Sequence, residues 1–462
     1  MPRIPRPSHP TRTSRTPRAR LGVFIGSLAA LTALGAAPPG AAAVPSGAGG
    51  PVAVPSGAGG PVASGPAASG AREAGAGVTA PTVEEARLDR AAPQEILRRG
   101  GFDSAGPGLA AALAGARSYA AAERAVTRQG SALWRRAVDR VQGRGPAARA
   151  GDLSRDDDRP LYWARLAMTR ELRAWQPRFA LSDPDRARLL DRLEVTSRGQ
   201  NTVRYPAGRG VKRVLLTGFD PFTLDRDVRI SNPSGAAALA LDGTLIRTAD
   251  GGRARVETVV FPVRWQDFAD GTVERTLRPH LPQVDLFTTV SQGRVGRFDV
   301  ERTNGAWRGG FGDNLNVSET GLVPVTDPGS QPQWTRTTLP SARITAADTG
   351  PFPVYDNTTV TEIPAGGTAP VTRPDGPTPG SAARAGGGGD YLSNEIAYRA
   401  TLLRDRLGLT GLPGGHLHTP VLQFGPGNTD PGGAVTDPSF LRDRAAITAQ
   451  VRSVVAVAAA RR

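Results

Sequence analysis

Cysteine is absent from the 462 residues of this chain. Without thiols the chain can form no disulfide, no thiolate metal site and no cysteine nucleophile, so any covalent catalysis would use an oxygen nucleophile. Histidine is scarce as well, which leaves few candidates for a general base. The four histidines are His9, His280, His416 and His418.

Lysine is almost absent, and Lys212 is the only one. The formal net charge of +15 therefore comes from arginine, and a basic excess of this size raises nucleic acid as a partner. The arginines are nevertheless interspersed with Asp and Glu, and several lie in a segment that we expect to be removed. These are Arg3, Arg6, Arg12, Arg15, Arg18 and Arg20. We therefore expect no nucleic-acid partner.

A long apolar run occurs near the N-terminus. Residues 1–43 have a basic start, an apolar run over Leu21–Ala37 and the small residues Ala41–Ala43, which together have the form of a cleavable export signal. The run is short for a membrane span and is interrupted by glycines. The sequence thus predicts a secreted protein with no stable membrane span after signal cleavage. An uncleaved signal anchor that tethers the protein to a membrane is the alternative.

Glycine and proline are abundant, with 57 and 41 residues, and they cluster. A tandem repeat reads AVPSGAGGPV over Ala43–Val52 and again over Ala53–Val62. Sequence of this kind buries too little apolar surface to become ordered. Residues 44–81 are therefore predicted to be a low-complexity linker.

Residues 82–200 show apolar residues at three- and four-residue steps, which predicts an α-helical region. The expected helices are Val83–Arg98, Leu109–Gln129, Ala132–Gln142, Leu161–Trp175 and Asp183–Leu193. Ser182 or Asp183 suits the cap of the last one, with Pro184 in its first turn. Asp156, Asp157 and Asp158 suggest a solvated loop, with a cation site as the alternative. The role of this region, a prodomain or a docking module, is left open.

Residues 211–462 alternate short β-branched runs with helical patterns. Strands are expected at Val211–Thr217, Arg255–Val263, Asp285–Val290 and His416–Phe424, and helices at Pro233–Leu241, Trp265–His280, Tyr391–Leu407 and Pro438–Ala459. This alternation predicts an α/β fold in which a mostly parallel, twisted sheet carries helices on both faces. Functional residues are then expected at the carboxyl ends of the strands. A Pro/Gly-rich segment over 364–388 interrupts the pattern.

The first predicted strand runs into VLLTGFDPF, Val214–Phe222, and Asn232-Pro233-Ser234 opens the next helix with Asn232 as a plausible cap. These strings resemble the opening signature of the pyroglutamyl peptidase I family. The resemblance implies a fold of that type, with Phe219 and Phe222 flanking a flat pyroglutamate ring and Asn232 contributing to substrate binding. The loop between Phe222 and Asn232 is longer than in the family. Without the resemblance, both rings would be expected to pack under the loop.

A second patch contains Gln292-Gly293-Arg294 and then Glu301-Arg302. Alone it reads as a turn followed by a surface salt bridge. It is similar to the family segment whose glutamate orients the catalytic histidine, which implies Glu301 as the acid of a triad and Gln292 as a substrate-binding residue. Arg308 begins a loosely matching stretch and is a candidate near the oxyanion.

The third patch, Gly388–Asn394, leads into a predicted helix. A serine at this place is usually a helix cap, but a nucleophile also benefits there because free N–H groups at a helix start stabilise negative charge. The stretch resembles the family's Ala-Gly-Thr-x-x-Cys-Asn. The resemblance places Ser393 at the position of the catalytic cysteine.

His416 and His418 follow Ser393 closely in the chain. The family pattern Gly-Phe-Ile-His-x-Pro selects His418 as the catalytic histidine, because Pro420 follows it at the matching distance. Histidines two apart on a strand can also share a metal, but no third ligand is evident, so no metal and no cofactor are expected.

The resemblance implies an exopeptidase-type hydrolase that releases amino-terminal pyroglutamate from peptides through Ser393, His418 and Glu301. A hydroxyl ionises far less readily than a thiol, so the serine needs well-aligned base catalysis. A catalytically inactive binder of capped peptide termini therefore stays open. A cell-surface interaction module that uses the helical region is a third possibility.

Overall fold

A computed structural model describes residues 79–206, 208 and 210–461. The expected signal at 1–43 and nearly all of the expected linker at 44–81 lie outside these residues. Within the part of the chain that is described, no helix has both the length and the apolarity that a membrane span requires.

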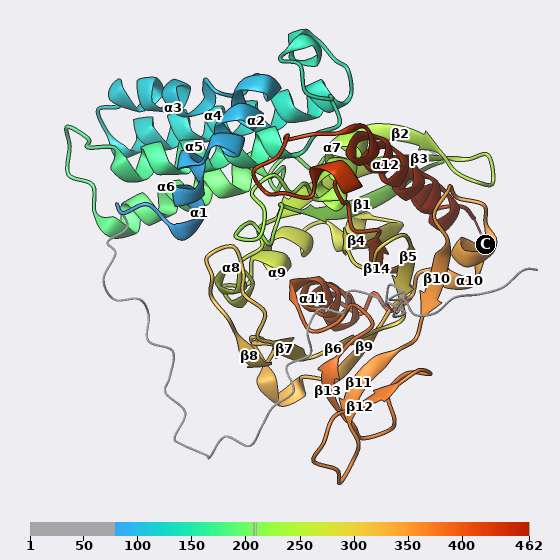
Figure 1. Ribbon diagram of the computed structural model, residues 1–462. Coiled ribbons are helices and arrows are strands. Elements are labelled where there is room, and N and C mark those ends of the chain that lie inside the picture. Colours follow the sequence, from blue (N-terminus) through green and yellow to red (C-terminus); the bar gives the residue numbers. More distant parts are fainter. Residues whose placement is uncertain (1–78, 207, 209, 462) are drawn as a thin grey trace, which may run out of the picture. The chain divides into compact units, whose positions relative to one another are not determined.

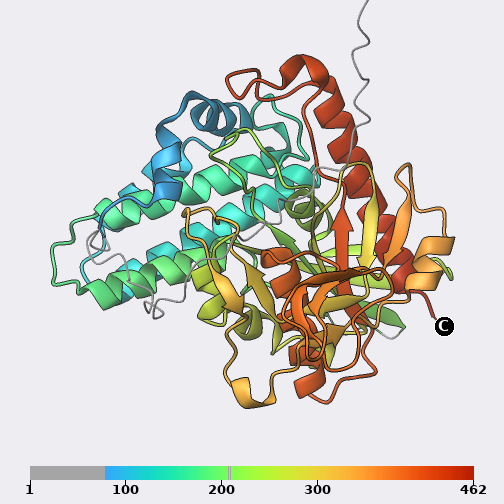
Figure 2. The same ribbon diagram turned by 60° about the horizontal axis from the view of Figure 1, so that its bottom comes forward.

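Helices dominate the part before residue 200. They are α1 (Val83–Ala86), α2 (Ala91–Gly100), α3 (Ala105–Ala114), α4 (Tyr119–Val141), α5 (Arg159–Ala174) and α6 (Asp183–Ser197), with a 3₁₀ turn at Arg87–Asp89. Ser182 caps α6, as predicted, by accepting a hydrogen bond from the amide of Asp185. Figure 2 shows the blue and green helices packed side by side. The region is thus a helical layer.

Several of the expected helix boundaries in this region are wrong. The helix expected over 83–98 is divided between α1 and α2, and the one expected over 183–193 continues to Ser197. The helix expected over 109–129 is divided between α3 and α4, because Ser118 caps the new helix at Ala121 N. The expected break after Gln129 does not occur. A methyl group on Gly130 would come within 2.1 Å of Thr196 Oγ1, so this glycine serves the close approach of α4 to α6 and not a turn.

The main sheet has seven strands in the order β10-β5-β14-β4-β1-β3-β2. Their bounds are β1 Val211–Phe219, β2 Thr244–Arg247, β3 Arg253–Phe261, β4 Leu286–Gln292, β5 Phe298–Glu301, β10 Val354–Asn357 and β14 Gly414–Thr419. The four central strands are parallel to one another, but β5 runs antiparallel to β14 and β2 antiparallel to β3. The sheet is therefore mixed, and the predicted parallel sheet describes its centre.

Helices cover both faces of the sheet. They are α7 (Pro233–Leu241), α8 (Trp265–Ala269), α9 (Thr272–Leu277), α10 (Ser341–Ala346), α11 (Leu392–Arg406) and α12 (Pro438–Ala458). Alternate residues of β1 enter different cores: Val214 packs in the cluster that contains α7 and α12, and Leu215 packs in the cluster that contains α9 and α11. Figure 1 shows α7 and α12 on one side of the strands and α11 on the other.

The helix expected over Trp265–His280 is broken between α8 and α9. Gly271 adopts φ +76 there, a left-handed conformation that ends one helix and starts the next. The other expected helices of this region, Pro233–Leu241, Tyr391–Leu407 and Pro438–Ala459, agree with α7, α11 and α12 to within one residue at each end.

Small sheets surround the start of α11. They are formed by β6 (Thr303–Gly305) with β9 (Trp334–Arg336), by β7 (Trp307–Gly309) with β8 (Thr320–Leu322), and by β11 (Val360–Ile363) with β12 (Val371–Arg373) and β13 (Ala382–Ala385). The Pro/Gly-rich segment 364–388 contains β12 and β13. It is thus an ordered part of the fold.

The acidic run before α5 is not the solvated loop that the sequence suggested. Asp157 and Asp158 are buried, and Asp157 is bound by Arg159 and by Arg444 from α12. Burial alone would raise the pKa of Asp157, but the two arginine charges outweigh it and lower the pKa. The neighbouring Asp158 has no such partner, and burial together with the charge of Asp157 raises its pKa to about 6.

The helical layer and the sheet share one hydrophobic core. A single cluster of buried side chains contains Trp163 of α5, Leu193 of α6, Val214 of β1 and Val454 of α12. The helical layer is therefore packed on the α/β region through apolar contacts as well as ion pairs.

Candidate active site

His418 and Glu301 meet at the carboxyl end of the central strands. His418 lies near the end of β14, and its Nδ1 is 2.7 Å from Oε1 of Glu301, the last residue of β5. Glu301 is fully buried, and His418 is 5% exposed. The second carboxylate oxygen, Oε2, accepts a hydrogen bond of 2.7 Å from Nδ2 of Asn357, its neighbour in β10. The acid is thus held on both oxygens, and one of them faces the imidazole.

Two glycines make room for this pair. A methyl group on Gly293 would lie 2.7 Å from His418 Cγ, and one on Gly387 would lie 2.2 Å from Glu301 Oε2. Real Cβ atoms do not approach that closely. The glycines that follow β4 and β13 therefore serve close packing around the imidazole and the carboxylate.

His416 has a different environment from His418. Its Nδ1 lies 2.7 Å from Thr289 Oγ1 and its Nε2 lies 2.9 Å from Ser291 Oγ, so both ring nitrogens have hydroxyl partners. Burial, with the nearby His418 as a smaller cause, lowers the pKa of His416 well below its ordinary value. Among the described residues no group of three or more His, Asp or Glu side chains could hold a metal ion. His416 is therefore a neutral, structural neighbour of the pair.

Ser393 is the second residue of α11. Its Oγ donates a hydrogen bond of 3.0 Å to the carbonyl oxygen of Gly388, and the side chain makes no hydrogen bond to His418. The imidazole and the first turn of α11 both lie beside Gly388, because a methyl group on Gly388 would lie 3.2 Å from His418 Cε1 and 3.5 Å from Asn394 N. The imidazole and the start of α11 thus border the same point.

The first turn of α11 is fixed but keeps free amide groups. Asn394 pins the turn to β6, since its Oδ1 accepts from Gly305 N at 2.9 Å and its Nδ2 donates to Gly305 O at 2.8 Å. The amides of Leu392, Ser393 and Asn394 have no acceptor among the residues that are described. Such amides at a helix start suit an oxygen that develops negative charge.

The two predicted substrate-flanking rings have different surroundings. Phe219 is 3% exposed and stacks on Phe268, with 6.1 Å between ring centroids, inside a hydrophobic cluster. Phe222 is half-buried and lies 5.9 Å from the ring of Tyr391, which caps the start of α11. The structure therefore brings Phe222 to the start of α11 and places Phe219 in the core.

Sequence reasoning missed three aromatic residues at this place. The ring centroid of Tyr391 lies 5.2 Å from that of Trp265 and 5.1 Å from that of Phe311, and the Tyr391 hydroxyl donates to Gly312 O at 3.0 Å. Tyr391 stood inside the serine motif, two residues before Ser393. Trp265 and Phe311 carry no local signal, because their contact with Tyr391 arises only in the folded chain.

The other predicted substrate-binding residues are distributed around the site. Asn232 caps α7 and uses its side chain on Ser234 N and Asp220 O, so its polar atoms are engaged inside the protein. Arg308 forms two hydrogen bonds of 2.7 Å with Glu395 of α11. Gln292 ends β4, and its Oε1 is buried without a hydrogen-bond partner among the described residues.

Comparisons with known proteins relate both regions of the chain to one family. A family model described as the PA0049 N-terminal domain matches residues 66–194, and one described as the PA0049 C-terminal domain matches residues 213–326 and 351–423. The uncharacterized protein PA0049 of Pseudomonas aeruginosa is 35% identical over 81% of this chain and 88% of the relative. Among solved structures, a pyrrolidone carboxyl peptidase from Thermococcus litoralis matches at 19% identity and a TM-score of 0.35, over 53% of this chain and 94% of that one.

Proposed function

Given that this chain belongs to the PA0049 family, a membership that by itself names no reaction, we propose from its site that it is a hydrolase of peptides with amino-terminal pyroglutamate. Ser393 is the nucleophile, His418 the base and Glu301 the acid that orients the base. We further propose that the expected signal at 1–43 exports the protein, so that the reaction takes place outside the cell.

The pairing of His418 with Glu301 is the observation that carries this proposal. A buried carboxylate 2.7 Å from Nδ1 fixes the ring orientation and the tautomer, and it stabilises the imidazolium that forms when Nε2 takes a proton. The pair stands beside a helix start that contains a hydroxyl and free amides. This combination of nucleophile, oriented base and amide donors is the arrangement that acyl transfer requires.

The reaction consists of two steps, acylation of Ser393 and hydrolysis of the resulting ester. Ser393 Oγ attacks the carbonyl carbon of the pyroglutamyl residue, its proton passes to His418 Nε2, and the amides at the start of α11 stabilise the oxyanion. His418 returns the proton to the leaving amine, which departs as the shortened peptide. Water then attacks the acyl-serine ester by the same route, and pyroglutamate and the free serine result.

The substrate class follows from the surroundings of Ser393 together with the motif resemblance. Phe222 and Tyr391 present aromatic surface at the helix start, which suits a flat and uncharged ring. The buried Oε1 of Gln292, which lacks a partner within the described part of the chain, is an acceptor for the lactam N–H.

A binder without turnover is the second candidate function. The hydrogen bond from Ser393 to Gly388 O, in place of one to His418, favours it. For catalysis the serine side chain must rotate about its Cα–Cβ bond, and catalytic hydrogen bonds of this kind often form only in the substrate complex.

A turnover assay separates the two candidates. We expect the purified protein to release the fluorophore from a pyroglutamyl amide and not from the matching prolyl amide, which lacks the lactam carbonyl. Ser393→Ala and His418→Ala should each abolish the release, with a loss on the order of 10³-fold. Equal background release from wild type and Ser393→Ala would exclude the hydrolase. Stabilisation of both by a pyroglutamyl peptide would then establish the binder.

A further inference from the structure

Two loops bring aromatic rings to Tyr391, and neither loop contains a helix or a strand. Phe222 lies in the loop after β1, residues 220–232, and Phe311 lies in the loop after β7, residues 310–319. Because these loops lack a ladder of backbone hydrogen bonds, their positions depend on the side chains that they pack against. Some of those side chains come from the helical layer, and others from the α/β region, where Trp265 Nε1 donates to Phe311 O at 3.0 Å.

Arg87 contacts both loops. Its Nε and Nη2 donate to the carboxylate of Asp225 in the first loop at 2.9 and 2.8 Å, and its Nη1 donates to Asn314 O in the second loop at 2.5 Å. Arg87 is 3% exposed. Burial would lower its pKa, but hydrogen bonding to Asp225 and the nearby negative charges outweigh this and raise the pKa. Arg87 is thus a charged, two-pronged link between the loops.

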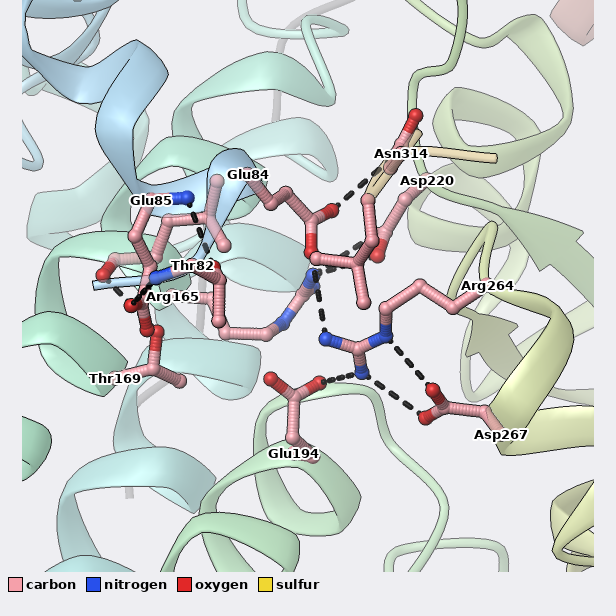
Figure 3. Close-up of polar contacts among 12 residues, drawn as sticks. Thr82, Glu84, Glu85, Arg165, Thr169, Glu194, Asp220, Arg264, Asp267 and Asn314 are labelled. Carbon is pink, nitrogen blue, oxygen red and sulfur yellow. Dashed lines mark hydrogen bonds and ion pairs between the residues drawn. The ribbon is translucent and has the colours of Figure 1, made fainter. Parts of the chain in front are cut away.

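Glu84 reinforces the same junction (Figure 3). Its Oε1 accepts from Asn314 Nδ2 at 3.1 Å, and its Oε2 lies 3.3 Å from Arg264 Nη1. The same Asn314 Nδ2 donates to the carbonyl oxygen of Pro221 at 2.9 Å. Since Pro221 precedes Phe222, Asn314 joins one loop directly to the other, and Glu84 fixes the joining amide.

A capping box holds this short turn in shape. The side chain of Thr82 accepts from Glu85 N at 3.1 Å, and Glu85 Oε2 accepts from Thr82 N at 2.9 Å (Figure 3). The reciprocal bonds fix the start of α1. Glu84 and Arg87 therefore project from a preformed turn.

The first loop is also held at its beginning. Asp220 lies 2.9 Å from Arg165 Nη1 and 2.6 Å from Arg198 Nη2, and all three side chains are buried. Burial would raise the pKa of Asp220, but the two arginines lower it. Burial and the charge of Arg165 lower the pKa of Arg198 to about 10, so it still carries its proton at neutral pH.

We propose that the helical layer is a constituent of the substrate pocket, and that Glu84 and Arg87 are positioning residues for the pyroglutamyl ring. Residues 82–90, here termed the clip, set the loops that carry Phe222 and Phe311, and through them two of the rings that contact Tyr391. The identity of the ligand rests on the proposed function. The layer is accordingly a permanent part of the mature protein, and a removable prodomain is excluded by this proposal.

The test uses the full-length chain with Arg87→Met, which keeps the apolar stem and removes the fork, and with Glu84→Gln. Because the clip contacts neither His418 nor Glu301, we expect KM for the pyroglutamyl amide to rise on the order of 10-fold while kcat and its pH profile stay unchanged. Arg87→Lys should also raise KM, and nearly as much, because a lysine ammonium cannot reproduce the forked hydrogen bonds of the guanidinium group. A fall in kcat with unchanged KM would overturn the proposal.

Arg186→Met is the matched control. Arg186 is a buried arginine of the same layer that donates to the carbonyls of Leu172, Arg173 and Trp175 and has no partner in the loops. It should lower thermal stability and leave KM unchanged. If Arg186→Met raised KM as much as Arg87→Met does, any destabilisation of the helical layer would raise KM. The proposed role of the clip would then be refuted.

Hydrogen exchange tests the clip without reference to activity. Arg87→Met should speed exchange in peptides covering 220–232 and 310–319 and leave β14 protected. Unchanged exchange in both loops would refute the clip even if the hydrolase assay succeeds. Accelerated exchange in a protein that neither hydrolyses nor binds pyroglutamyl compounds would retain the clip and refute the proposed function.

Discussion

The chemistry at position 393 depends on a single atom. A serine hydroxyl ionises far above neutral pH, whereas a free cysteine thiol has a pKa of about 8.5 and becomes more acidic beside an imidazole or a helix start. The serine therefore depends on proton removal during attack, and His418 must be aligned at that moment. Ser393 instead donates to Gly388 O, so its side chain must rotate before it can react.

Ser393→Cys should convert the site into a thiolate–imidazolium site. We expect turnover of the pyroglutamyl amide to rise at least about 10-fold over wild type, because ionisation of the nucleophile no longer limits attack. The chain contains no other cysteine, so alkylation by iodoacetamide reports on residue 393 alone. The pH dependence of the alkylation rate should give a thiol pKa below about 8.5.

The control for this variant is the double substitution Ser393→Cys with His418→Ala. Removal of the imidazole should return the thiol pKa toward its ordinary value and slow alkylation at neutral pH. If the pH dependence of the alkylation rate were identical in the single and the double variant, His418 would not interact with the side chain at position 393.

At the scale of elements, local signals predicted the helices better than the sheet edges. The bounds of α7 follow from Asn232 as cap and Pro233 in the first turn, and both signals are local. The strands β5 and β10 have four residues each, too few to show alternation, and they were missed. Their absence from the prediction also concealed Asn357, which pairs with Glu301 only because β10 lies beside β5.

The substitution Gly387→Ala tests whether the close packing of the segment between β13 and α11 against Glu301 matters for activity. Gly387→Ala would place a carbon 2.2 Å from Glu301 Oε2, so the carboxylate must move away from His418 or Asn357. We expect kcat/KM to fall on the order of 10²-fold, with a loss of stability of about 1–3 kcal/mol from overpacking. Kinetics and thermal melts measure the two effects.

Gly411→Ala is the companion variant, because nothing lies within 4 Å of the added carbon. It should change neither quantity. Full activity in Gly387→Ala would show that the carboxylate does not need its observed position.

At the scale of the whole molecule, the sequence predicted two regions of different secondary structure but not their junction. Three consecutive aspartates resembled a solvated loop because one of their main partners is remote in sequence: Arg444 contacts Asp156 across 288 residues and also binds Asp157. The same limit applies to the site. Motif order predicted Ser393, Glu301 and His418, whereas the clip contacts depend on side chains far apart in the chain, which a single sequence does not connect.

The stability of the folded protein should depend on pH through Asp158, which lies just before α5 in the helical layer. Its pKa is raised from the ordinary value of 3.8 to about 6, so the folded state binds this proton more tightly than the unfolded state. The stability contributed by that proton is present below about pH 4 and is lost as pH rises through about 6. Asp158→Asn mimics the protonated form and should remove the loss. The melting temperature of wild type minus that of the variant should therefore fall by a few degrees between pH 4 and 6.

The difference between the two melting temperatures removes most of the pH dependence that comes from carboxyl groups present in both proteins. One of these is Asp157, whose lowered pKa affects stability only at more acidic pH. A difference that stays constant from pH 4 to 7 would contradict the raised pKa of Asp158.

The contact between Arg444 and the aspartates before α5 also orders events during biosynthesis. Asp156 and Asp157 are synthesised early, and Arg444 of α12 follows 288 residues after Asp156. The two acids therefore lack this arginine through most of translation. Until then the helical layer lacks the ion pairs with Arg444 and the apolar side chains of α12 that complete the shared core. The fold is therefore complete only after α12 has been synthesised.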